Sequence, residues 1–199
     1  MKKEILIPLV FLLLAVFLVS GQQGCPAPEQ AQELTGEQIE EKTEETYELP
    51  ETGWRDGELT DVLTGKTFKI SEFKGKPILL ESFAVWCPTC LQQQRKIKEL
   101  IAQESEGEVI HISIDTDPNE DAQQIIDHAN ENDLVWLFAI SPTAYTLALI
   151  DEFTTRVIAA PTAPVILICD DPEQTARLLK RGVKSANELK EEIAKGCDA

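Results

Sequence analysis

The segment that most constrains the fold of this chain surrounds two cysteines, Cys87 and Cys90. Residues 77–85 are mostly apolar and predict a buried strand, whereas residues 91–100 carry apolar side chains at three- and four-residue intervals and predict a helix. Cys87 is therefore expected at the N-terminus of that helix, where free backbone N–H groups and the helix dipole stabilise a thiolate and lower the cysteine pKa. A thiolate with a second thiol one helical turn away indicates thiol–disulfide redox chemistry.

Zinc, haem and a purely structural disulfide are the alternative uses of this cysteine spacing. A structural zinc site takes four ligands, and the only two histidines in the sequence, His111 and His128, form no paired ligand motif. Covalent haem attachment requires a histidine directly after Cys90, where Leu91 stands. The sequence thus predicts no metal site and no cofactor, and a structural Cys87–Cys90 disulfide remains as the alternative to a redox pair.

The charge of the chain excludes one class of partner. Acidic side chains outnumber basic ones among the 199 residues and give a formal net charge of -17. A nucleic-acid-binding protein needs a basic surface to displace counterions from phosphates, so we expect no nucleic-acid partner. Hydrophobic residues make up 43% of the chain, which is enough for the core of one ordinary domain.

Residues 1–24 have the features of a signal peptide. Two lysines precede an apolar stretch at 5–19, which is long enough for the hydrophobic region of a signal and short for a membrane-spanning helix. The residues before Cys25 resemble a prokaryotic lipoprotein signal, which implies a lipid on Cys25, although Gln22 stands where that pattern has an aliphatic residue. An uncleaved signal anchor is the alternative. Either attachment predicts a domain on the extracytoplasmic face of the cell membrane.

Two further regions follow the signal segment. Residues 25–57 are rich in Glu and Gln and poor in apolar side chains, which predicts an acidic flexible linker. Residues 58–199 predict an α/β domain that begins with a hairpin over 59–70 and continues as a sheet with a parallel centre and an antiparallel edge. Strands are expected at 77–85, 109–115, 165–168 and 176–180, and helices at 91–100, 119–132, 144–153 and 185–195.

Three motifs, in this order, resemble the thioredoxin superfamily. They are Gly75-Lys76 before the cysteine strand with Trp86-Cys87-Pro88-Thr89-Cys90 after it, Ile114-Asp115 at the end of the next strand, and Ala160-Pro161-Thr162 before the fourth. Over residues 58–196 the chain is most similar to the membrane-anchored TlpA/ResA-like branch of extracytoplasmic thiol–disulfide oxidoreductases. This resemblance implies a thioredoxin-like fold, with a central mixed sheet flanked by helices and an N-terminal hairpin extension. The chain departs from the pattern at two positions. Val85 stands where Thr or Glu is more typical, and Cys169 stands where this branch usually has Asp.

The resemblance also implies catalytic roles. Cys87 would be the exposed nucleophile that attacks a partner disulfide, and the more buried Cys90 would resolve the mixed disulfide. Glu81 matches the buried acid of thioredoxins and would take the proton of Cys90, because burial raises a carboxyl pKa. A solvent-facing Glu81 at a sheet edge is the alternative. His111 would either pair with Glu81 or be a satisfied core histidine.

Four positions are expected to bind the substrate or shield the cysteine pair. Pro161 resembles the cis-proline that faces the cysteines in this fold, and the backbone of Ala160 would then hydrogen-bond an extended substrate segment. An ordinary trans turn at Pro161 is the alternative. Trp86 would shield the disulfide or simply pack, and Pro88, between the cysteines, would tune the reduction potential.

The two remaining cysteines are Cys169 and Cys197. In the topology that the resemblance implies, the fourth strand and the last helix both run away from the cysteine pair, so their ends meet at the opposite pole. An oxidising compartment favours a structural disulfide between Cys169 and Cys197, and two inert thiols are the alternative.

Two functions fit these observations. The first is a membrane-tethered, monomeric protein-disulfide oxidoreductase, a reductant of protein disulfides or of apocytochrome thiols, that works through Cys87 and Cys90 and is regenerated by a membrane electron donor. The second is a thioredoxin-fold chaperone that binds copper or a thiol ligand without redox turnover. The metal content of protein purified under reducing conditions separates the two.

Overall fold

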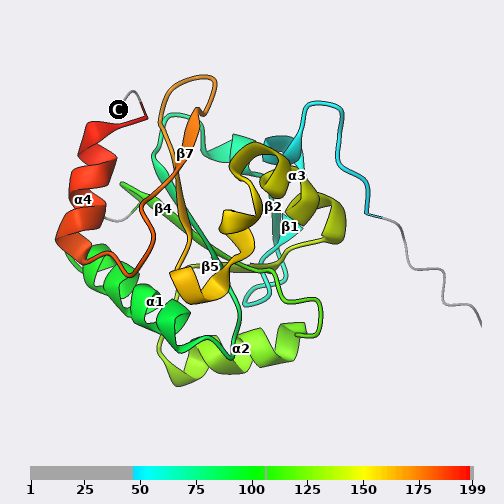
Figure 1. Cartoon of the computed structure of the whole chain (residues 1–199), viewed down its shortest axis with the longest axis horizontal. Helices are drawn as coiled ribbons and strands as arrows, with labels where there is room; N and C mark the ends of the chain where they lie inside the picture. Colours follow the sequence, from blue (N-terminus) through cyan, green and yellow to red (C-terminus); the bar gives the residue numbers. More distant parts are fainter. Residues whose placement is uncertain (1–46, 106, 198–199) are drawn as a thin grey trace, which may run out of the picture. The chain divides into compact units, whose positions relative to one another are not determined.

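The computed structural model describes residues 47–105 and 107–197 (Figure 1). The expected signal segment, Cys25 and most of the acidic linker lie outside these residues. The described part contains one five-stranded sheet with the strand order β5-β4-β3-β6-β7. Its strands are β3 (Ile78–Phe83), β4 (Ile110–Asp115), β5 (Leu137–Ile140), β6 (Val165–Ile168) and β7 (Ala176–Leu178).

The sheet is mixed. Strands β3, β4 and β5 are parallel to one another, while β6 runs antiparallel to β3 and β7 antiparallel to β6. The expected α/β fold with a parallel centre and an antiparallel edge is therefore confirmed. Strand β3 lies in the middle of this sheet, so its side chains are covered on both faces.

Helices and short 3-10 segments cover both faces of the sheet. The helices are α1 (Pro88–Ile101), α2 (Ala122–Glu131), α3 (Thr143–Phe153) and α4 (Ala186–Lys195), and the 3-10 segments are η1 (Trp54–Asp56), η2 (Ile70–Phe73), η3 (Thr155–Ile158) and η4 (Ala160–Thr162). Helices α1, α2 and α4 pack on the face that carries Leu79 and Phe83. Helix α3 and the segments η1 to η3 pack on the face that carries Ile78 and Leu80.

Strand β3 is buried along its whole length because both faces of the sheet are covered. Side chains alternate between the two faces of a strand, so Glu81 points to the same side as Leu79 and Phe83, beneath α1. This alternation places a carboxyl group inside an apolar layer.

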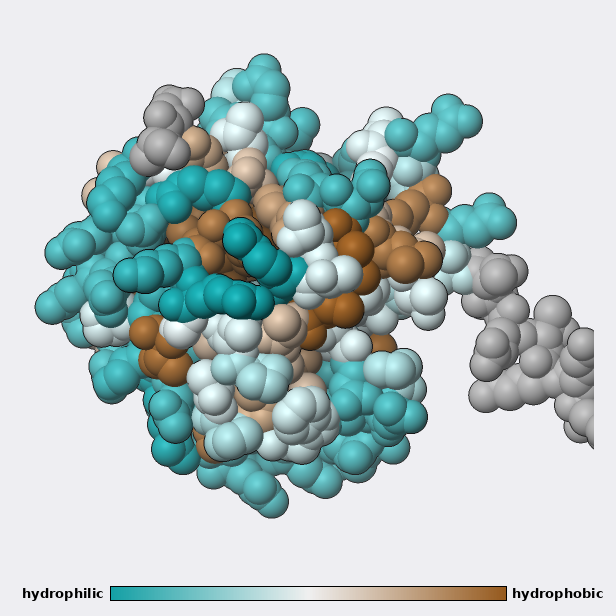
Figure 2. Space-filling model, in the orientation of Figure 1, coloured by the Kyte–Doolittle hydropathy of each residue, from teal (hydrophilic) through white to brown (hydrophobic). Residues whose placement is uncertain are grey.

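The exterior is mostly polar. Figure 2 shows mostly hydrophilic residues on the visible face, with hydrophobic residues gathered over the region of α3.

The expected N-terminal hairpin is present. Strands β1 (Leu59–Thr60) and β2 (Thr67–Phe68) pair antiparallel. The hairpin is fastened to the edge strand β5, because the N–H of Val62 donates to the carbonyl of Phe138 (2.8 Å) and the N–H of Phe138 donates to the buried carboxylate of Asp61 (3.1 Å). These bonds satisfy backbone groups that an open sheet edge would leave unpaired.

Candidate active site

The two cysteines lie where β3 gives way to α1. Cys87 is the N-cap of α1, and its Sγ accepts a hydrogen bond from the backbone N–H of Cys90 at 3.2 Å. Pro88 follows at the first helical position, where its fixed φ suits the helix and its missing N–H costs nothing. The sulfur of Cys87 thus lies at the N-terminus of α1, the positive end of the helix dipole.

Both cysteines are free thiols, and each is only 1% exposed. The expectation that Cys87 is solvent-exposed is therefore wrong. The physical reason is the capping bond, which turns the Cys87 sulfur inward toward the first turn of α1. Trp86 takes the outer position instead and is 59% exposed.

Cys90 is held as a protonated thiol. Burial raises its pKa, and the hydrogen bond with Cys87 and the negative charge of Glu81 raise it further. Its Sγ donates to the carbonyl oxygen of Ala160 at 3.1 Å. A thiol in this environment needs a base before it can act as a nucleophile.

Glu81 is a buried acid that could serve as this base for Cys90. The Glu81 side chain is fully buried, and burial raises the pKa of its carboxyl group from 4.5 to about 8. The hydroxyl of Ser113 and the positive charge of Lys184 oppose this shift. One carboxylate oxygen, Oε2, accepts a hydrogen bond from Ser113 Oγ at 2.8 Å. The other, Oε1, has no hydrogen-bond partner within residues 47–105 and 107–197. Glu81 is therefore not a solvent-facing residue, and burial keeps its carboxyl group protonated to a higher pH than an ordinary glutamate.

A hydrogen-bond chain leads to Glu81 from the next strand. The indole N–H of Trp136 donates to Ser113 Oγ at 3.0 Å, and Ser113 in turn donates to Glu81. Ser113 lies directly opposite Glu81 in the parallel pairing of β3 with β4. Sequence reasoning missed both residues, although the alignment of two parallel strands would have placed Ser113 beside Glu81.

Lys184 is a second residue that the sequence did not reveal. Its ammonium group is buried and donates to the carbonyls of Ala163 (2.6 Å) and Gly182 (2.7 Å). The side chain of Gln93 on α1 holds the backbone of Lys184 through two hydrogen bonds. Burial lowers the lysine pKa to about 8, and the charge of Glu81 opposes that shift. Lys184 lies in the loop before α4, and the tertiary fold brings its charge toward Glu81. No local sequence motif predicts this contact.

His111 does not pair with Glu81. Strand register sets His111 beside Leu79, two positions before the Glu81–Ser113 pair. Its Nε2 lies 3.0 Å from Oε2 of Glu104, and both side chains are largely buried. The proposed His111–Glu81 contact is thus replaced by a His111–Glu104 pair near the opposite end of β4.

The segment of Ala160 and Pro161 also differs from expectation. No cis peptide bond occurs in the described part of the chain, so Pro161 is trans. It lies in the first turn of η4, which accepts the φ of a trans proline without strain. The carbonyl of Ala160 accepts hydrogen bonds from Ala163 N and Cys90 Sγ, so this group faces the cysteine pair rather than open solvent.

Two carboxylates fix the segment in front of Cys87. Glu120 accepts a hydrogen bond from the backbone N–H of Val85 at 2.7 Å, and Asp117 accepts one from the indole N–H of Trp86, also at 2.7 Å. Nearby Asp115, at the end of β4, is buried, and burial raises its pKa to about 7. The loop after β4 therefore places the carboxylates of Glu120 and Asp117 against Val85 and Trp86, which the sequence did not indicate.

Comparison with known proteins decides the family. A family model described as Redoxin matches residues 40–174, more than half of the chain. The chain belongs to the Redoxin family. This result confirms the resemblance to the thioredoxin superfamily.

Curated relatives of this Redoxin chain include the thiol:disulfide interchange protein DsbE of two bacteria. The protein from Vibrio cholerae is 36% identical over 107 residues, which cover 51% of this chain and 50% of the relative. The protein from Pasteurella multocida is 29% identical over 109 residues, which cover 52% of each chain. The chain thus spans about half the length of the curated relatives it matches.

Solved structures show the same fold. A secreted disulfide oxidoreductase of Mycobacterium tuberculosis superposes with a TM-score of 0.55 at 16% identity, over 70% of this chain and 96% of that one. The thioredoxin domain of a Bacteroides vulgatus thiol-disulfide oxidoreductase gives a TM-score of 0.54 at 17% identity, over 68% and 91%. The Redoxin domain described here therefore has the thioredoxin-like fold.

The second cysteine pair of the chain is disulfide-bonded. A disulfide joins Cys169 to Cys197, which are 28 positions apart in the sequence. Cys169 follows β6, whose last residue, Ile168, pairs with Ile78 at the start of β3. The disulfide accordingly lies at the end of the sheet opposite Cys87.

No helix among the described residues is long and apolar enough to cross a membrane.

Proposed function

We propose that this chain is an extracytoplasmic, membrane-tethered thiol–disulfide oxidoreductase that reduces protein disulfides with Cys87 and Cys90. The observation that carries the proposal is the capped cysteine pair, in which Cys87 Sγ accepts the Cys90 N–H at the start of α1 with the buried acid Glu81 behind it. The DsbE relatives are named as thiol:disulfide interchange proteins, which supports the same chemistry.

The reaction proceeds by two exchanges. The Cys87 thiolate attacks one sulfur of the partner's disulfide, the partner S–S bond breaks, and the partner's second sulfur leaves as a thiolate that is then protonated. Cys90 next loses its proton to Glu81, and its thiolate attacks Cys87 Sγ. The mixed disulfide breaks and releases the other partner thiolate. Two electrons have then passed to the partner, and Cys87 and Cys90 form a disulfide.

Glu81 is suited to receive the Cys90 proton because its pKa is about 8. An ordinary carboxyl group would be too weak a base for a thiol whose pKa burial has raised. We assign Ser113 and Lys184 to the support of Glu81, since both favour its ionised form. They act through Glu81 and are therefore positioning residues.

Attack by Cys87 requires local opening, because the residue is buried. A hollow of about 150 Å³ is lined by Trp86, the residue before Cys87, and by Asp117 and Ala160, among others. We expect a partner segment to enter here and to displace the exposed Trp86. The hydrogen bond from Trp86 to Asp117 would then report substrate binding.

The cellular setting is part of the proposal. A bridged Cys169–Cys197 pair is typical of proteins in oxidising compartments and supports an extracytoplasmic site. We place the tether at a lipid on Cys25 or at an uncleaved signal anchor, and the reducing electrons come from a membrane donor. Mass spectrometry of the membrane-extracted protein tests this part: a diacylglyceryl group on Cys25 supports the lipid, an intact Met1 supports the anchor, and an unmodified chain cleaved before Cys25 contradicts both.

Reduction of insulin disulfides by the full chain tests the enzymatic part. We expect Cys87→Ser to abolish reduction and Cys90→Ser to accumulate a mixed disulfide with the substrate. Wild-type activity in either variant would contradict the mechanism. The double variant Cys169→Ala/Cys197→Ala is the matched control and should retain the activity, since its disulfide lies at the other end of the sheet.

A further inference from the structure

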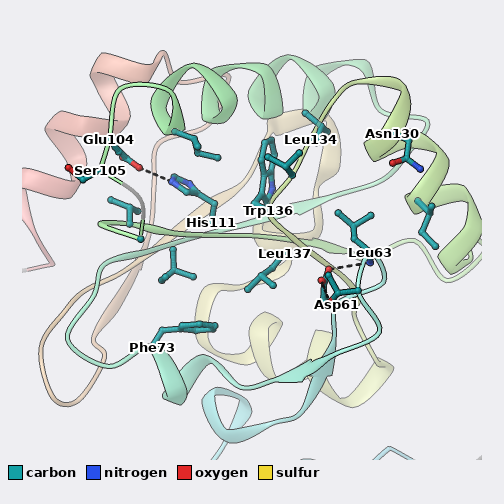
Figure 3. A pocket seen from close by; sticks show the side chains of 17 residues that line it. Asp61, Leu63, Phe73, Glu104, Ser105, His111, Asn130, Leu134, Trp136 and Leu137 are labelled. Atoms are coloured by element: carbon teal, nitrogen blue, oxygen red, sulfur yellow. Dashed lines mark hydrogen bonds and ion pairs between the residues drawn. The ribbon is translucent and has the colours of Figure 1, made fainter.

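A large cavity lies away from the cysteine pair. It has a volume of about 620 Å³, enough for a small organic molecule. Its wall includes the start of β4, where Ile110 and His111 lie, whereas the end of β4 is beside Phe83 and the cysteine pole. Figure 3 shows the side chains converging from α1, β4, β5, the loop before β5 and the N-terminal hairpin. The apolar part of the wall comes mainly from Leu63, Phe73, Ile101, Leu134, Trp136 and Leu137.

One end of the cavity carries a buried polar pair. Glu104 and His111 both line it and lie 3.0 Å apart, with side-chain exposures of 9% and 6%. The second ring nitrogen of the histidine, Nδ1, is buried and has no hydrogen-bond partner among the residues that the structure describes. A buried polar atom without a partner is costly, so a ligand whose donor reaches this nitrogen, which the surrounding atoms now cover, would remove that cost.

The chemistry of the pair defines what the ligand must supply. A carboxylate only accepts hydrogen bonds, so Nε2 of His111 carries the proton that faces Glu104. In the neutral imidazole, Nδ1 is then an acceptor. In this neutral form the polar end of the cavity offers acceptors, and a hydrogen-bond donor on the ligand would complement it.

The carboxylates of the wall argue against an anionic ligand. The carboxylate of Asp61, at the other end of the cavity, is occupied by hydrogen bonds within the hairpin and to β5. The indole N–H of Trp136 is directed to Ser113 and leaves only the ring for contact. Two carboxylates in the wall and a net charge of -17 would repel an anion, whereas an uncharged donor meets no such penalty.

We propose that this cavity binds a small, flat, uncharged apolar molecule that carries a hydroxyl or N–H donor, with its ring against Trp136 and its donor at the Glu104–His111 pair. The cavity wall shares Trp136 with the hydrogen-bond chain that leads to Glu81, but it contains neither Cys87 nor Cys90. Its ligand-binding can therefore be measured independently of the redox function.

Two matched probes test the proposal by isothermal titration of the full chain in buffer without detergent, because detergent would compete for an apolar cavity. The first probe is 1-naphthol, which has a hydroxyl donor, and the second is 1-methoxynaphthalene, which has the same rings and no donor. We expect saturable binding of 1-naphthol and an affinity at least about tenfold lower for the methoxy compound, because its oxygen would leave the buried acceptor unpaired. Equal affinities, or no saturable binding of 1-naphthol, would overturn the proposal.

Variants locate the binding. His111→Phe removes the acceptor while keeping a ring of similar shape, so 1-naphthol should bind it about tenfold more weakly, with little change for the methoxy compound. Leu63→Trp should fill the cavity and abolish binding of both, whereas Leu147→Ser, at an exposed position on α3, should change neither. Unchanged 1-naphthol affinity in His111→Phe or in Leu63→Trp would contradict the site. If a variant fails to fold, the two-probe comparison on the unaltered chain still decides.

Discussion

The hydroxyl of Ser113 on β4 donates a hydrogen bond of 2.8 Å to the buried carboxylate of Glu81 on β3. The hydroxyl is itself held by the indole N–H of Trp136. This bond is a direct polar contact that favours the ionised form of Glu81 inside an apolar layer. The pKa of Glu81, and with it the protonation of Cys90, therefore depends on a residue of the neighbouring strand.

Ser113→Ala should raise the pKa of Glu81 above its present value of about 8. A hydrogen bond to a charged group is worth about 1.5–3 kcal/mol, so we expect a shift of roughly one unit or more. The rate at which the mixed disulfide is resolved, measured against pH in single turnovers, should then reach its half-maximum at a correspondingly higher pH. Ser71→Ala, on η2, is the control and should leave the profile unchanged. An identical profile for Ser113→Ala would show that Ser113 does not act on Glu81.

Glu81→Gln should stabilise the fold at alkaline pH. The folded protein keeps the Glu81 proton up to a pH of about 8, whereas the unfolded chain releases it near 4.5. Stability contributed at this site is therefore present below about pH 4.5 and is lost as the pH rises to 8. We expect Glu81→Gln to raise the free energy of unfolding by about 1–3 kcal/mol at pH 8 and by little at pH 4.

Urea unfolding at the two pH values measures this difference. Glu99→Gln, at an exposed position on α1, is the matched control and should show no such dependence on pH. The interpretation of Glu81 as a buried titrating group fails if Glu81→Gln changes the free energy of unfolding by the same amount at both pH values.

Lys184→Met should destabilise the domain. The substitution keeps most of the apolar stem and removes the ammonium group that binds the carbonyls of Ala163 and Gly182. Buried carbonyls without partners cost about 1–3 kcal/mol each, so a loss of about 2–4 kcal/mol in unfolding free energy is expected. Lys190→Met, on the exposed side of α4, should lose less than about 0.5 kcal/mol. Equal stabilities of the two variants would contradict the structural role of Lys184.

Removal of the second disulfide should reduce stability without reducing activity. For a loop with 28 positions of separation, the chain-entropy relation gives about 3–4 kcal/mol of stabilisation. Cys169→Ala/Cys197→Ala should lose about that much in urea unfolding and still reduce insulin disulfides at the wild-type rate. A large loss of activity under folding conditions would mean that this pair takes part in the chemistry.

Much of the fold could be predicted because its signals are local. The apolar run at 77–85 and the helical spacing at 91–100 place β3 and α1, and the position of Cys87 as N-cap follows from them. The turn residues between β1 and β2 also predict the hairpin that these strands form. These elements depend on neighbours in sequence.

The surroundings of the cysteines could not be predicted in the same way. Strand register decides that Ser113 rather than His111 faces Glu81, and a one-residue or two-residue shift would change that answer. Lys184 is brought in by a loop about a hundred positions after Glu81, and the burial of Cys87 results from its capping bond and the packing around it. Each of these features depends on contacts between distant segments.

The reduction potential of the Cys87/Cys90 pair tests the central claim most directly. The full chain is equilibrated with a dithiol buffer, the fraction of oxidised pair is followed, and Cys87→Ser/Cys90→Ser supplies the baseline. A two-electron transition at or below about -250 mV, in the range of thioredoxin, is the predicted result, since such a pair donates electrons to protein disulfides. A potential near about -120 mV would identify an oxidant that installs disulfides and would contradict the proposed reductase.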